Sequence, residues 1–426
     1  MKRRVLLVSP YFPPHETIGS KRAINFVQAI RESDHWEVVV LASRPFSGEC
    51  NPSLNATIPS EVPVYHAFVA PWRPFIRLLA SNLLKKSQSS APSTQSRRST
   101  NRSFTPFDQY LWDVPAAIHH GKKLIKRYQP DLIWVNADPW SGFLAAYHLN
   151  RITGVPWVAD LRDPWTIFEW RMLTRPRLVR RIISYYERRF FTTATRVVFN
   201  SETASQAYQG AYPERISKKF TFIRNAFNPS LLPAPEPTIN HPFIFGYFGG
   251  FRPVVPSAPL LKGFAGFVQD SGLLPDHVRF VVSGKVDPDF WHLAEELEIK
   301  PYIEMGKGVP FVDALSLLRS WDVLLIVAIN DYRWMIPAKF YDYLFARKPI
   351  LAASDNHELN SMILQTKSGK SAPSTDLQAI AGLFSSYYQE GKTGLLSNEN
   401  DILPYGQKNQ NARFLEVMEQ CVTNSI

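Results

Sequence analysis

The sequence predicts an α/β protein with two domains, each built around a parallel sheet covered by helices. The chain has 426 residues, more than one hydrophobic core usually organises. Short apolar runs alternate with longer helical patterns, which is typical of parallel strands joined by crossover helices. This alternation stops at a proline-rich stretch and then starts again. The restart indicates a second domain of the same kind rather than an extension of the first.

The first domain is expected to span residues 1–228 and to contain five strands and three main helices. Several of the strand candidates are apolar throughout, as strands covered on both faces should be. The strands are expected at Val5–Val8, Val38–Ala42, Leu132–Val135, Trp157–Ala159 and Arg196–Phe199. The helices are expected at Lys21–Arg31, Pro115–Tyr128 and Gly142–Thr153.

The second domain is expected to span residues 243–405. Five prolines and little periodicity in residues 228–242 indicate a semi-rigid linker over residues 229–242. Strands are then expected at Phe243–Phe248, Val278–Ser283, Val323–Val327 and Ile350–Ala353. Residues 406–426 are expected to form a C-terminal helix, over Asn409–Val422, that can pack back on the first domain.

Composition restricts the class of protein. With 45% apolar and 13% aromatic residues, the chain can form real cores and is not a disordered polymer. Cys50 and Cys421 form no disulfide framework and fit a reducing, cytoplasmic compartment. The apolar run Val5–Val8 is too short for a signal peptide or a membrane span, and we interpret it as a buried strand. No later segment reaches about 18 uninterrupted apolar residues, so no transmembrane helix is expected.

The formal net charge of +11 bears on partners rather than on fold. It fits a phosphate-rich substrate, an anionic membrane surface or simply a basic soluble surface. No nucleic-acid partner is expected, because the chain has no motif typical of one. Residues Trp72–Lys86 mix aromatic, apolar and basic side chains, which suits either a helix on an anionic membrane or a core-packing helix with a basic outer face. The Ser-, Lys- and Arg-rich residues 83–102 are expected to be a mobile basic loop.

The first candidate site follows the first strand. Gly19 opens a helix whose free N–H groups and positive dipole end can bind an anion. Ser20, Lys21 and Arg22 add donors and charge there, which favours binding of a phosphate or of an acceptor substrate. The spacing does not match the dinucleotide-binding motif GxGxxG. The alternative interpretation is an ordinary turn between a strand and a helix.

The second candidate site follows the strand Trp157–Ala159, which runs directly into Asp160, Arg162 and Asp163. In open α/β sheets, ligands bind at the carboxyl ends of strands. These three residues are therefore candidate catalytic residues. The alternative is that Arg162 pairs with a carboxylate for a structural reason.

The third candidate site is the sequence IPAKFYDYL. Pro337 suits the first turn of a helix, and Lys339 follows at its positive end, where a diphosphate can be held. Asp342 lies one turn deeper on the same side, where its carboxylate can accept hydrogen bonds from ribose hydroxyls. The alternative is a plain amphipathic helix with a surface salt bridge.

Several motifs together resemble a known family. They are YFPP…G…R, PDLIWVNADPW, VPWVADLRDPW, VVFNSE, IRNAFN and IPAKFYDYLFARKPILA. In order and spacing they resemble the GT-B glycosyltransferases of family 4 (glycosyltransferase group 1), especially those of bacterial surface polysaccharide synthesis. The resemblance runs from Val5 to about Gly369. It implies two Rossmann-like domains with parallel sheets that face each other across a cleft.

The resemblance also implies a function. The C-terminal domain would bind a nucleotide-sugar donor and the N-terminal domain a hydroxyl acceptor, which is often lipid-linked. Such enzymes are commonly retaining and need no metal or other cofactor, and they work in the cytoplasm or peripherally at the inner membrane face. The sequence leaves open a sugar-nucleotide epimerase of the same fold and a catalytically silent scaffold that binds nucleotide sugars.

Individual motif positions carry over to this chain. The family's lysine falls on Lys339 and its ribose-binding acid on Asp342. The strand-end HD pair of many relatives aligns with Arg162-Asp163. The glycine-rich turn at the start of the second domain matches Gly249-Gly250. Arg252 is then a further candidate contact to the diphosphate.

The chain departs from the family pattern at two places. Many relatives carry an acid eight positions before the one matched by Asp342, where this chain has Trp334. The glycine pair that is usual in the first loop is reduced to Gly19. Asp287 and Asp289 have the spacing of a metal-binding DxD motif found in a different fold, and we do not expect them to bind a metal.

Overall fold

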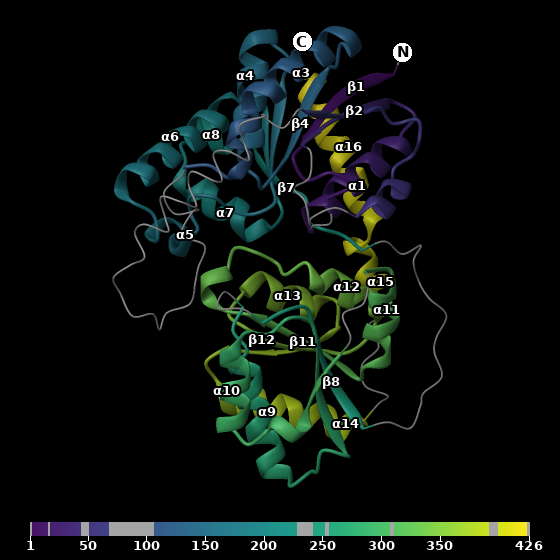
Figure 1. Ribbon diagram of the computed structural model, residues 1–426, viewed down its shortest axis with the longest axis vertical. Coiled ribbons are helices and arrows are strands. Elements are labelled where there is room, and N and C mark those ends of the chain that lie inside the picture. Colours follow the sequence, from purple (N-terminus) through teal and green to yellow (C-terminus); the bar gives the residue numbers. More distant parts are fainter. Residues whose placement is uncertain are drawn as a thin grey trace. The chain divides into compact units, whose positions relative to one another are not determined.

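The computed structural model describes residues 2–15, 18–43, 51–67, 106–227, 242–251, 255–306, 311–391 and 399–423. The chain forms two compact units. Unit 1 comprises residues 1–223 and 411–426, and unit 2 comprises residues 224–410. Each unit contains one parallel sheet (Figure 1). The linker expected at residues 229–242 lies outside the described residues except for Pro242.

The sheet of unit 1 has seven strands in the order β3-β2-β1-β4-β5-β6-β7. They are β1 (Arg3–Ser9), β2 (Trp36–Ser43), β3 (Val64–Ala67), β4 (Leu132–Ala137), β5 (Trp157–Leu161), β6 (Arg196–Phe199) and β7 (Phe220–Phe222). The five strands expected from the sequence are confirmed as β1, β2, β4, β5 and β6. The two edge strands, β3 and β7, were not expected.

Helices cover both faces of this sheet. One face packs against α1 (Ile18–Arg31) and α16 (Gln407–Thr423), where Phe26 and Phe414 contact Trp134 of β4. The other face packs against three helices, where Trp157 of β5 contacts residues of α4 and α6. These helices are α3 (Val114–Tyr128), α4 (Ser141–Thr153) and α6 (Arg177–Thr193). The shorter helices of unit 1 are α5 (Glu169–Leu173), α7 (Glu202–Ala211) and α8 (Glu214–Ser217), and its 3-10 turns are η1 (Pro52–Thr57) and η3 (Gln109–Asp113).

The sheet of unit 2 has six strands in the order β10-β9-β8-β11-β12-β13. They are β8 (Phe243–Phe248), β9 (Val278–Ser283), β10 (Ile303–Met305), β11 (Val323–Ala328), β12 (Ile350–Ser354) and β13 (Gly369–Ala372). The four expected strands are confirmed as β8, β9, β11 and β12. Again the two edge strands, β10 and β13, were not expected.

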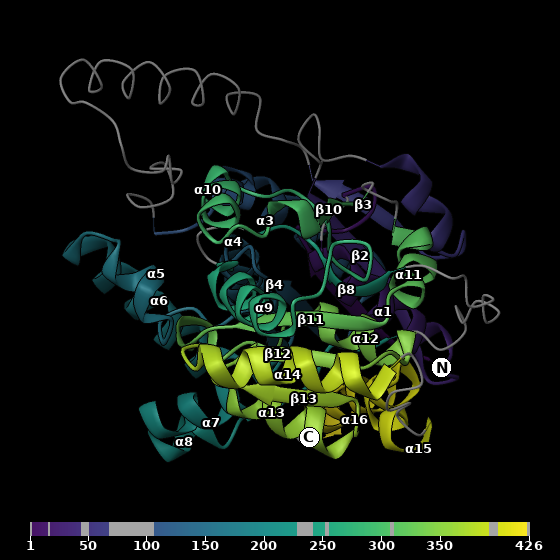
Figure 2. The same cartoon turned by 90° about the horizontal axis from the view of Figure 1, so that it is seen from below.

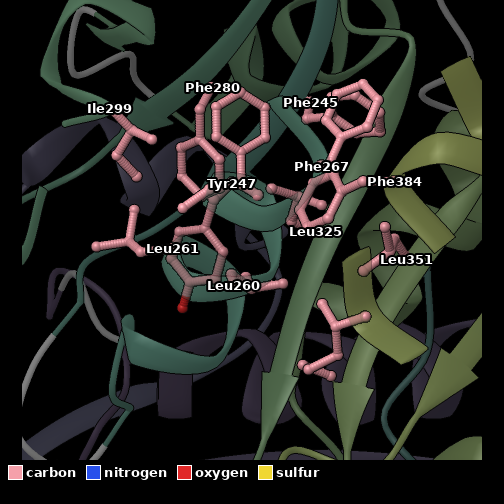
Figure 3. Close-up of a cluster of buried hydrophobic side chains, with 14 of the residues drawn as sticks. Phe245, Tyr247, Leu260, Leu261, Phe267, Phe280, Ile299, Leu325, Leu351 and Phe384 are labelled. Carbon is pink, nitrogen blue, oxygen red and sulfur yellow. The ribbon is translucent and has the colours of Figure 1, made fainter. Parts of the chain in front are cut away.

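Two cores cover the two faces of this second sheet. Leu325 and Val327 of β11 face a core formed with α9 (Ala258–Ser271) and α14 (Leu377–Glu390) (Figures 2 and 3). Leu324 and Ile326 face the opposite core. Its helices are α11 (Phe311–Ser320), α12 (Lys339–Ala346) and α13 (His357–Gln365). The remaining elements are α10 (Pro288–Glu296), α15 (Glu399–Ile402), η5 (Lys300–Tyr302), η6 (Asn330–Tyr332) and η8 (Leu403–Tyr405).

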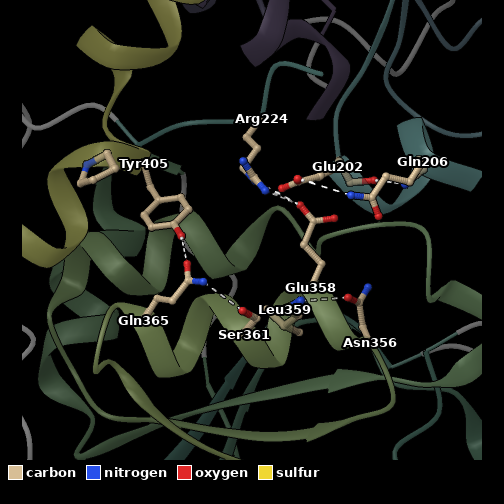
Figure 4. Close-up of polar contacts among 12 residues, drawn as sticks. Glu202, Gln206, Arg224, Asn356, Glu358, Leu359, Ser361, Gln365 and Tyr405 are labelled. Carbon is tan, nitrogen blue, oxygen red and sulfur yellow. Dashed lines mark hydrogen bonds and ion pairs between the residues drawn. The ribbon is translucent and has the colours of Figure 1, made fainter. Parts of the chain in front are cut away.

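Polar contacts join the first and last segments of unit 2 (Figure 4). The Arg224 guanidinium donates to Glu358 Oε1 of α13 at 2.8 and 3.1 Å. Tyr405 donates its hydroxyl proton to Gln365 Oε1 on the same helix at 3.3 Å. Both ends of unit 2 are therefore held against α13.

Among the residues that the structure describes, no helix is long and apolar enough to cross a membrane. The segment Trp72–Lys86, expected to be either a membrane-surface helix or a core-packing helix, and the basic loop expected at residues 83–102 lie outside these residues.

Candidate functional site

Both sheets have a topological switch point, where neighbouring strands lead to crossovers in opposite directions. It lies between β1 and β4 in unit 1 and between β8 and β11 in unit 2. Loops that leave the carboxyl ends of such a strand pair diverge, and the crevice between them is where α/β proteins bind ligands. Most of the site residues predicted from the sequence lie between one of these four strands and the next strand, in the loop or near the start of the helix that follows it.

In unit 2, the turn after β8 requires glycine. Gly249 has φ +111°, a conformation that residues with a side chain rarely adopt. Its N–H donates to the Ser283 carbonyl at the end of β9 at 2.9 Å. A Cβ atom on Gly250 would lie 2.6 Å from the carbonyl oxygen of Lys285. The predicted glycine pair thus lets two strand ends approach closely and leaves the backbone of the turn accessible to a ligand.

Lys339 lies over this turn. It is the first residue of α12, and its Nζ is 3.5 Å from the ring centroid of Tyr247. A Cβ atom built on Gly249 would lie 3.3 Å from the same ammonium. The cation and the positive end of α12 therefore coincide at the glycine turn. The structure brings these predicted residues together.

A buried tyrosine holds α12 in this position. The Tyr343 hydroxyl accepts from the Phe248 N–H at 3.0 Å and donates to the Leu325 carbonyl at 3.2 Å. It thereby ties α12 to the end of β8 and to the middle of β11. Burial raises the pKa of Tyr343 far above its usual value, so the hydroxyl keeps its proton.

Other predicted donor-site residues lie close by in the sequence. Asp342 is half-buried in the first turn of α12. Pro337 was expected in the first helical turn but precedes the helix, and its carbonyl accepts from the Phe340 N–H at 2.9 Å. Arg252 lies outside the described residues. The Trp334 ring lies under the Arg333 guanidinium, 4.7 Å from its centroid.

Two further observations concern the end of β9. Lys285 is exposed beside the glycine turn and was missed by the sequence analysis, although a Ser-Gly-Lys sequence directly after an apolar strand was the available signal. Asp287 caps α10 by accepting from the Phe290 N–H at 3.1 Å. The first acid of the apparent DxD motif therefore has a structural role. Within the described ranges there is no group of three or more side chains suited to hold a metal.

In unit 1, Gly19 lies directly against Arg162. A Cβ atom on Gly19 would be 2.6 Å from Arg162 Nη1, so a larger residue would displace the guanidinium. Arg162 Nη2 donates to Asp163 at 3.2 Å and to Asp138 at 3.5 Å. Burial lowers the pKa of Arg162, but Asp163 and Asp138 outweigh it and raise the pKa overall. A permanently charged cation thus lies where the first helix begins.

Arg22 and Asp160 form a second, fully buried pair. The Arg22 guanidinium donates to both Asp160 oxygens at 2.7 to 3.1 Å and to the Ile223 carbonyl at 3.0 Å. Asn136 and Trp134 also donate to Asp160, at 3.0 and 3.3 Å. Both residues were predicted to contact substrate. The hydrogen-bond partners described above are all protein groups, which gives Arg22 and Asp160 a structural role beneath the site.

The neighbouring predicted residues have mixed environments. The Ser20 hydroxyl is buried and donates to the His15 carbonyl at 2.6 Å, which ties the start of α1 to the preceding loop. Lys21 is half-buried on the same turn. Of the first predicted group, Gly19 is therefore the residue with a close approach to Arg162 described here.

A buried carboxylate anchors the loop that follows Asp163. Glu187 of α6 accepts from the Thr166 N–H at 3.0 Å and from the hydroxyls of Tyr208 and Tyr212, both at 2.8 Å. Tyr208 in turn accepts from the Trp165 N–H at 2.9 Å. Burial raises the pKa of Glu187 above its ordinary value. This network fixes the backbone that carries Arg162 and Asp163.

A small, partly open pocket lies at the carboxyl ends of β1 and β2 in unit 1, with room for little more than a water molecule or a single hydroxyl group. Most of its walls are apolar. Tyr110, Asp113, Ser43 and Ser141 supply its hydroxyls and its carboxylate, and no lysine or arginine is among its lining residues. Such walls suit a hydroxyl group of an uncharged ligand.

One protein family and several solved structures are similar to this chain. Residues 20–231 match the model of Glycosyltransferase Family 4. No curated protein matches the chain in sequence.

The fold is similar to that of several solved structures. Anabaena HepE in complex with UDP-glucose has a TM-score of 0.64 at 12% identity, covering 98% of this chain and 99% of that one. S. aureus TarM with fondaparinux, α-GlcNAc-glycerol and UDP has a TM-score of 0.62 at 8% identity, covering 99% of both chains. A putative UDP-N-acetylglucosamine 2-epimerase from Listeria monocytogenes has a TM-score of 0.57 at 11% identity, covering 98% of this chain and 96% of that one. The two parallel-sheet units therefore have the GT-B fold, as the sequence predicted.

Proposed function

We propose that this chain, a GT-B glycosyltransferase that carries a Glycosyltransferase Family 4 domain over residues 20–231, transfers a sugar from a uridine diphosphate sugar to a hydroxyl acceptor. The observation that carries the proposal is the Lys339 ammonium over the Gly249 turn at the start of α12. The similar structures of HepE with UDP-glucose and TarM with UDP support uridine as the base.

The donor would bind to unit 2 through its diphosphate. Lys339, the positive end of the α12 dipole and the backbone of Gly249 and Gly250 would provide a positive site for it. Lys285, after β9, would supply further positive charge beside the glycine turn, and Arg252 stays a contact expected from the sequence. Asp342 would accept hydrogen bonds from the ribose hydroxyls.

Transfer breaks the bond between the anomeric carbon and the diphosphate oxygen, and a new bond forms from that carbon to the acceptor oxygen. The acceptor hydroxyl loses its proton, which an oxygen of the leaving diphosphate would accept. The leaving diphosphate gains negative charge as the sugar becomes oxocarbenium-like. A preorganised cation such as Lys339 stabilises that charge without a metal. We propose that the reaction retains the anomeric configuration and needs no metal or other cofactor.

Unit 1 would hold the acceptor. The Arg162–Asp163 pair lies beside the start of α1 and would orient the acceptor hydroxyl. The pocket with Tyr110, Asp113 and the two serines would hold a sugar hydroxyl of the acceptor. We propose a lipid-linked or polysaccharide-precursor acceptor, with the enzyme working peripherally at the cytoplasmic face of the membrane in polysaccharide biosynthesis.

A thermal-shift panel tests the donor. A ligand that binds only the folded state raises the melting temperature by mass action. We expect UDP and one UDP-sugar to stabilise the protein more than ADP, GDP or CDP at equal concentration. Equal stabilisation by all four diphosphates would contradict the assignment of uridine. No stabilisation by any of them would contradict nucleotide binding itself.

A sugar-nucleotide epimerase is the second candidate, favoured by the similar fold of the Listeria epimerase. Conversion of a UDP-sugar into its epimer without an acceptor would establish it. The Trp334 substitution favours a third possibility, a scaffold that binds nucleotide sugars without turning them over. Tight UDP-sugar binding with no transfer or hydrolysis across a donor panel would establish that one.

A further inference from the structure

Three adjacent helices of unit 1 carry a strong excess of positive charge. The helices α3, α4 and α6 pack side by side on one face of the sheet, with α4 between the other two (Figure 1). Lysine and arginine number four in α3, one in α4 and five in α6. The three helices contain a single acidic residue, Glu187. Glu187 is buried, so it does not offset the charge at the surface.

Nine of these ten basic side chains are exposed, and Arg180 is half-buried. We define the basic face as the exposed side chains of α3, α4 and α6. Its cations are Lys122, Lys123, Lys126, Arg127, Arg151, Arg177, Arg181, Arg188 and Arg189. The nearest exposed acid along the chain to α6 is Glu169 on α5. A surface of this sign attracts polyanions over distances comparable to the Debye length.

Large apolar side chains project from the same face. Ile152 at the end of α4 is 53% exposed, and Leu178 and Tyr185 of α6 are 68% and 54% exposed. Leu173 on α5 and Trp112, just before α3, continue the pattern at its margins. All the large apolar residues found exposed in the described part of unit 1 are therefore on or beside the basic face.

The combination points to one kind of partner. An anionic bilayer offers phosphate groups to the cations and an acyl boundary into which Leu, Ile, Trp and Tyr side chains can insert. A nucleic acid would satisfy the cations but leave exposed leucine and isoleucine side chains without an apolar partner. We infer that the basic face is a docking surface for a bilayer that contains anionic phospholipid.

This inference deepens the proposed function, because a lipid-linked acceptor requires the enzyme to reach a bilayer. It names a surface different from the segment Trp72–Lys86 suggested by the sequence. Vesicle binding needs no nucleotide and UDP binding needs no vesicle, so the two claims can fail separately.

Co-sedimentation of the full-length protein with vesicles tests the inference. We expect binding to phosphatidylcholine vesicles that contain phosphatidylglycerol, none to pure phosphatidylcholine, and release by high salt. The triple variant Lys123→Glu, Arg181→Glu, Arg188→Glu should lower the partition coefficient at least about 100-fold, because each cation near such a surface contributes about fivefold. The matched control Lys262→Glu, Lys300→Glu, Lys408→Glu changes the net charge equally at exposed positions of unit 2 and should bind nearly as wild type does.

The apolar contribution is tested separately. Ile152→Ser with Leu178→Ser should weaken vesicle binding at a salt concentration that leaves wild type bound, whereas Leu364→Ser, at an exposed leucine of unit 2, should not. Unchanged UDP stabilisation of each variant reports intact folding. The inference is overturned if wild type ignores anionic vesicles at low salt, or if the unit 2 control loses binding equally. Charge reversal in the segment Trp72–Lys86 gives a further test, at Arg73, Arg77, Lys85 and Lys86. The inference is overturned if this reversal abolishes vesicle binding while the basic-face triple variant still binds. It is also overturned if duplex DNA binds more tightly than vesicles and the apolar variants leave vesicle binding unchanged.

Discussion

Lys339 and Gly249 show how much of the donor site a sequence can specify. The start of a helix after a proline predicts a positive end, and a lysine there predicts an anion site. The structure adds that the lysine lies over a glycine turn from another strand. That contact joins residues 90 positions apart and depends on the strand order, so the motifs alone could not establish it.

A variant at Asp342 can distinguish binding of the nucleoside from binding of the diphosphate. Asp342→Asn should weaken UDP binding about tenfold or more, the cost of a charge-assisted hydrogen bond, because its proposed partner is the ribose. Inorganic pyrophosphate has no ribose, so its affinity should hardly change. Competition binding against both ligands measures the difference. Equal weakening of the two would mean that the carboxylate supports the fold instead.

The sequence pattern predicted that Arg22 binds a ligand, whereas the structure shows it paired with the buried Asp160. Removing one member of a buried ion pair leaves the other charge uncompensated. Arg22→Ala should therefore lower the free energy of unfolding by about 3–5 kcal/mol while the folded protein binds UDP normally. Arg215→Ala, at an exposed arginine of the same unit, is the control. Stability equal to the control would contradict the structural role of Arg22.

At the scale of elements, the sequence predicted the interior of both sheets and missed their edges. The unexpected strands β3, β7, β10 and β13 are the edge strands of the two sheets. Interior strands are apolar throughout because helices cover both faces, whereas edge strands are short and of mixed polarity. The sequence Gly369–Ala372, for example, has no apolar run to mark it as a strand.

The helix α6 was also missed, although it is 17 residues long. No helix was expected over these residues. The Glu187 carboxylate is in fact buried against α7 and the loop after β5. Sequence spacing cannot reveal that partnership, because Tyr208 and Tyr212 come from a different helix.

Titration of Glu187 should make the stability of the folded protein depend on pH. Its pKa is raised by burial, so the folded state binds the proton more readily than the unfolded state does. The stability it contributes is therefore present below the ordinary pKa and is lost as the pH rises through the folded-state pKa. Glu187→Gln does not titrate, so its stability relative to wild type should increase as the pH is raised from about 4.5 to 7.

Urea unfolding across this pH range checks the prediction, with Glu416→Gln on the exposed side of α16 as the control. A stability difference between Glu187→Gln and wild type that is flat with pH would refute it.

At the scale of the whole molecule, each unit repeats one design, in which a parallel sheet presents its switch-point loops to a ligand. The division of roles between the units came from the family resemblance, and the motif order along the chain supported it. The sequence gives the net charge of +11 but not where the basic side chains gather on the folded surface. Only the packing of α3, α4 and α6 shows that so much of it shares one face of unit 1.

Metal independence is a prediction for the intact protein. Because Asp287 caps α10 and Lys339 supplies the positive charge, UDP should bind with the same affinity in excess EDTA as in Mg²⁺ or Mn²⁺. Calorimetric titration in the three buffers measures this directly. A UDP affinity that collapses in EDTA and returns with Mn²⁺ would overturn the metal-free mechanism.

The most direct test of the account is calorimetric titration of UDP into wild type and Lys339→Ala, with Lys262→Ala in the same unit as the control. Loss of a charged hydrogen bond to the diphosphate should cost about 1.5–3 kcal/mol, or about 10- to 150-fold in affinity. The control should bind UDP as wild type does. An affinity unchanged by Lys339→Ala would contradict the placement of the nucleotide at the Gly249 turn, and with it the donor site proposed for this enzyme.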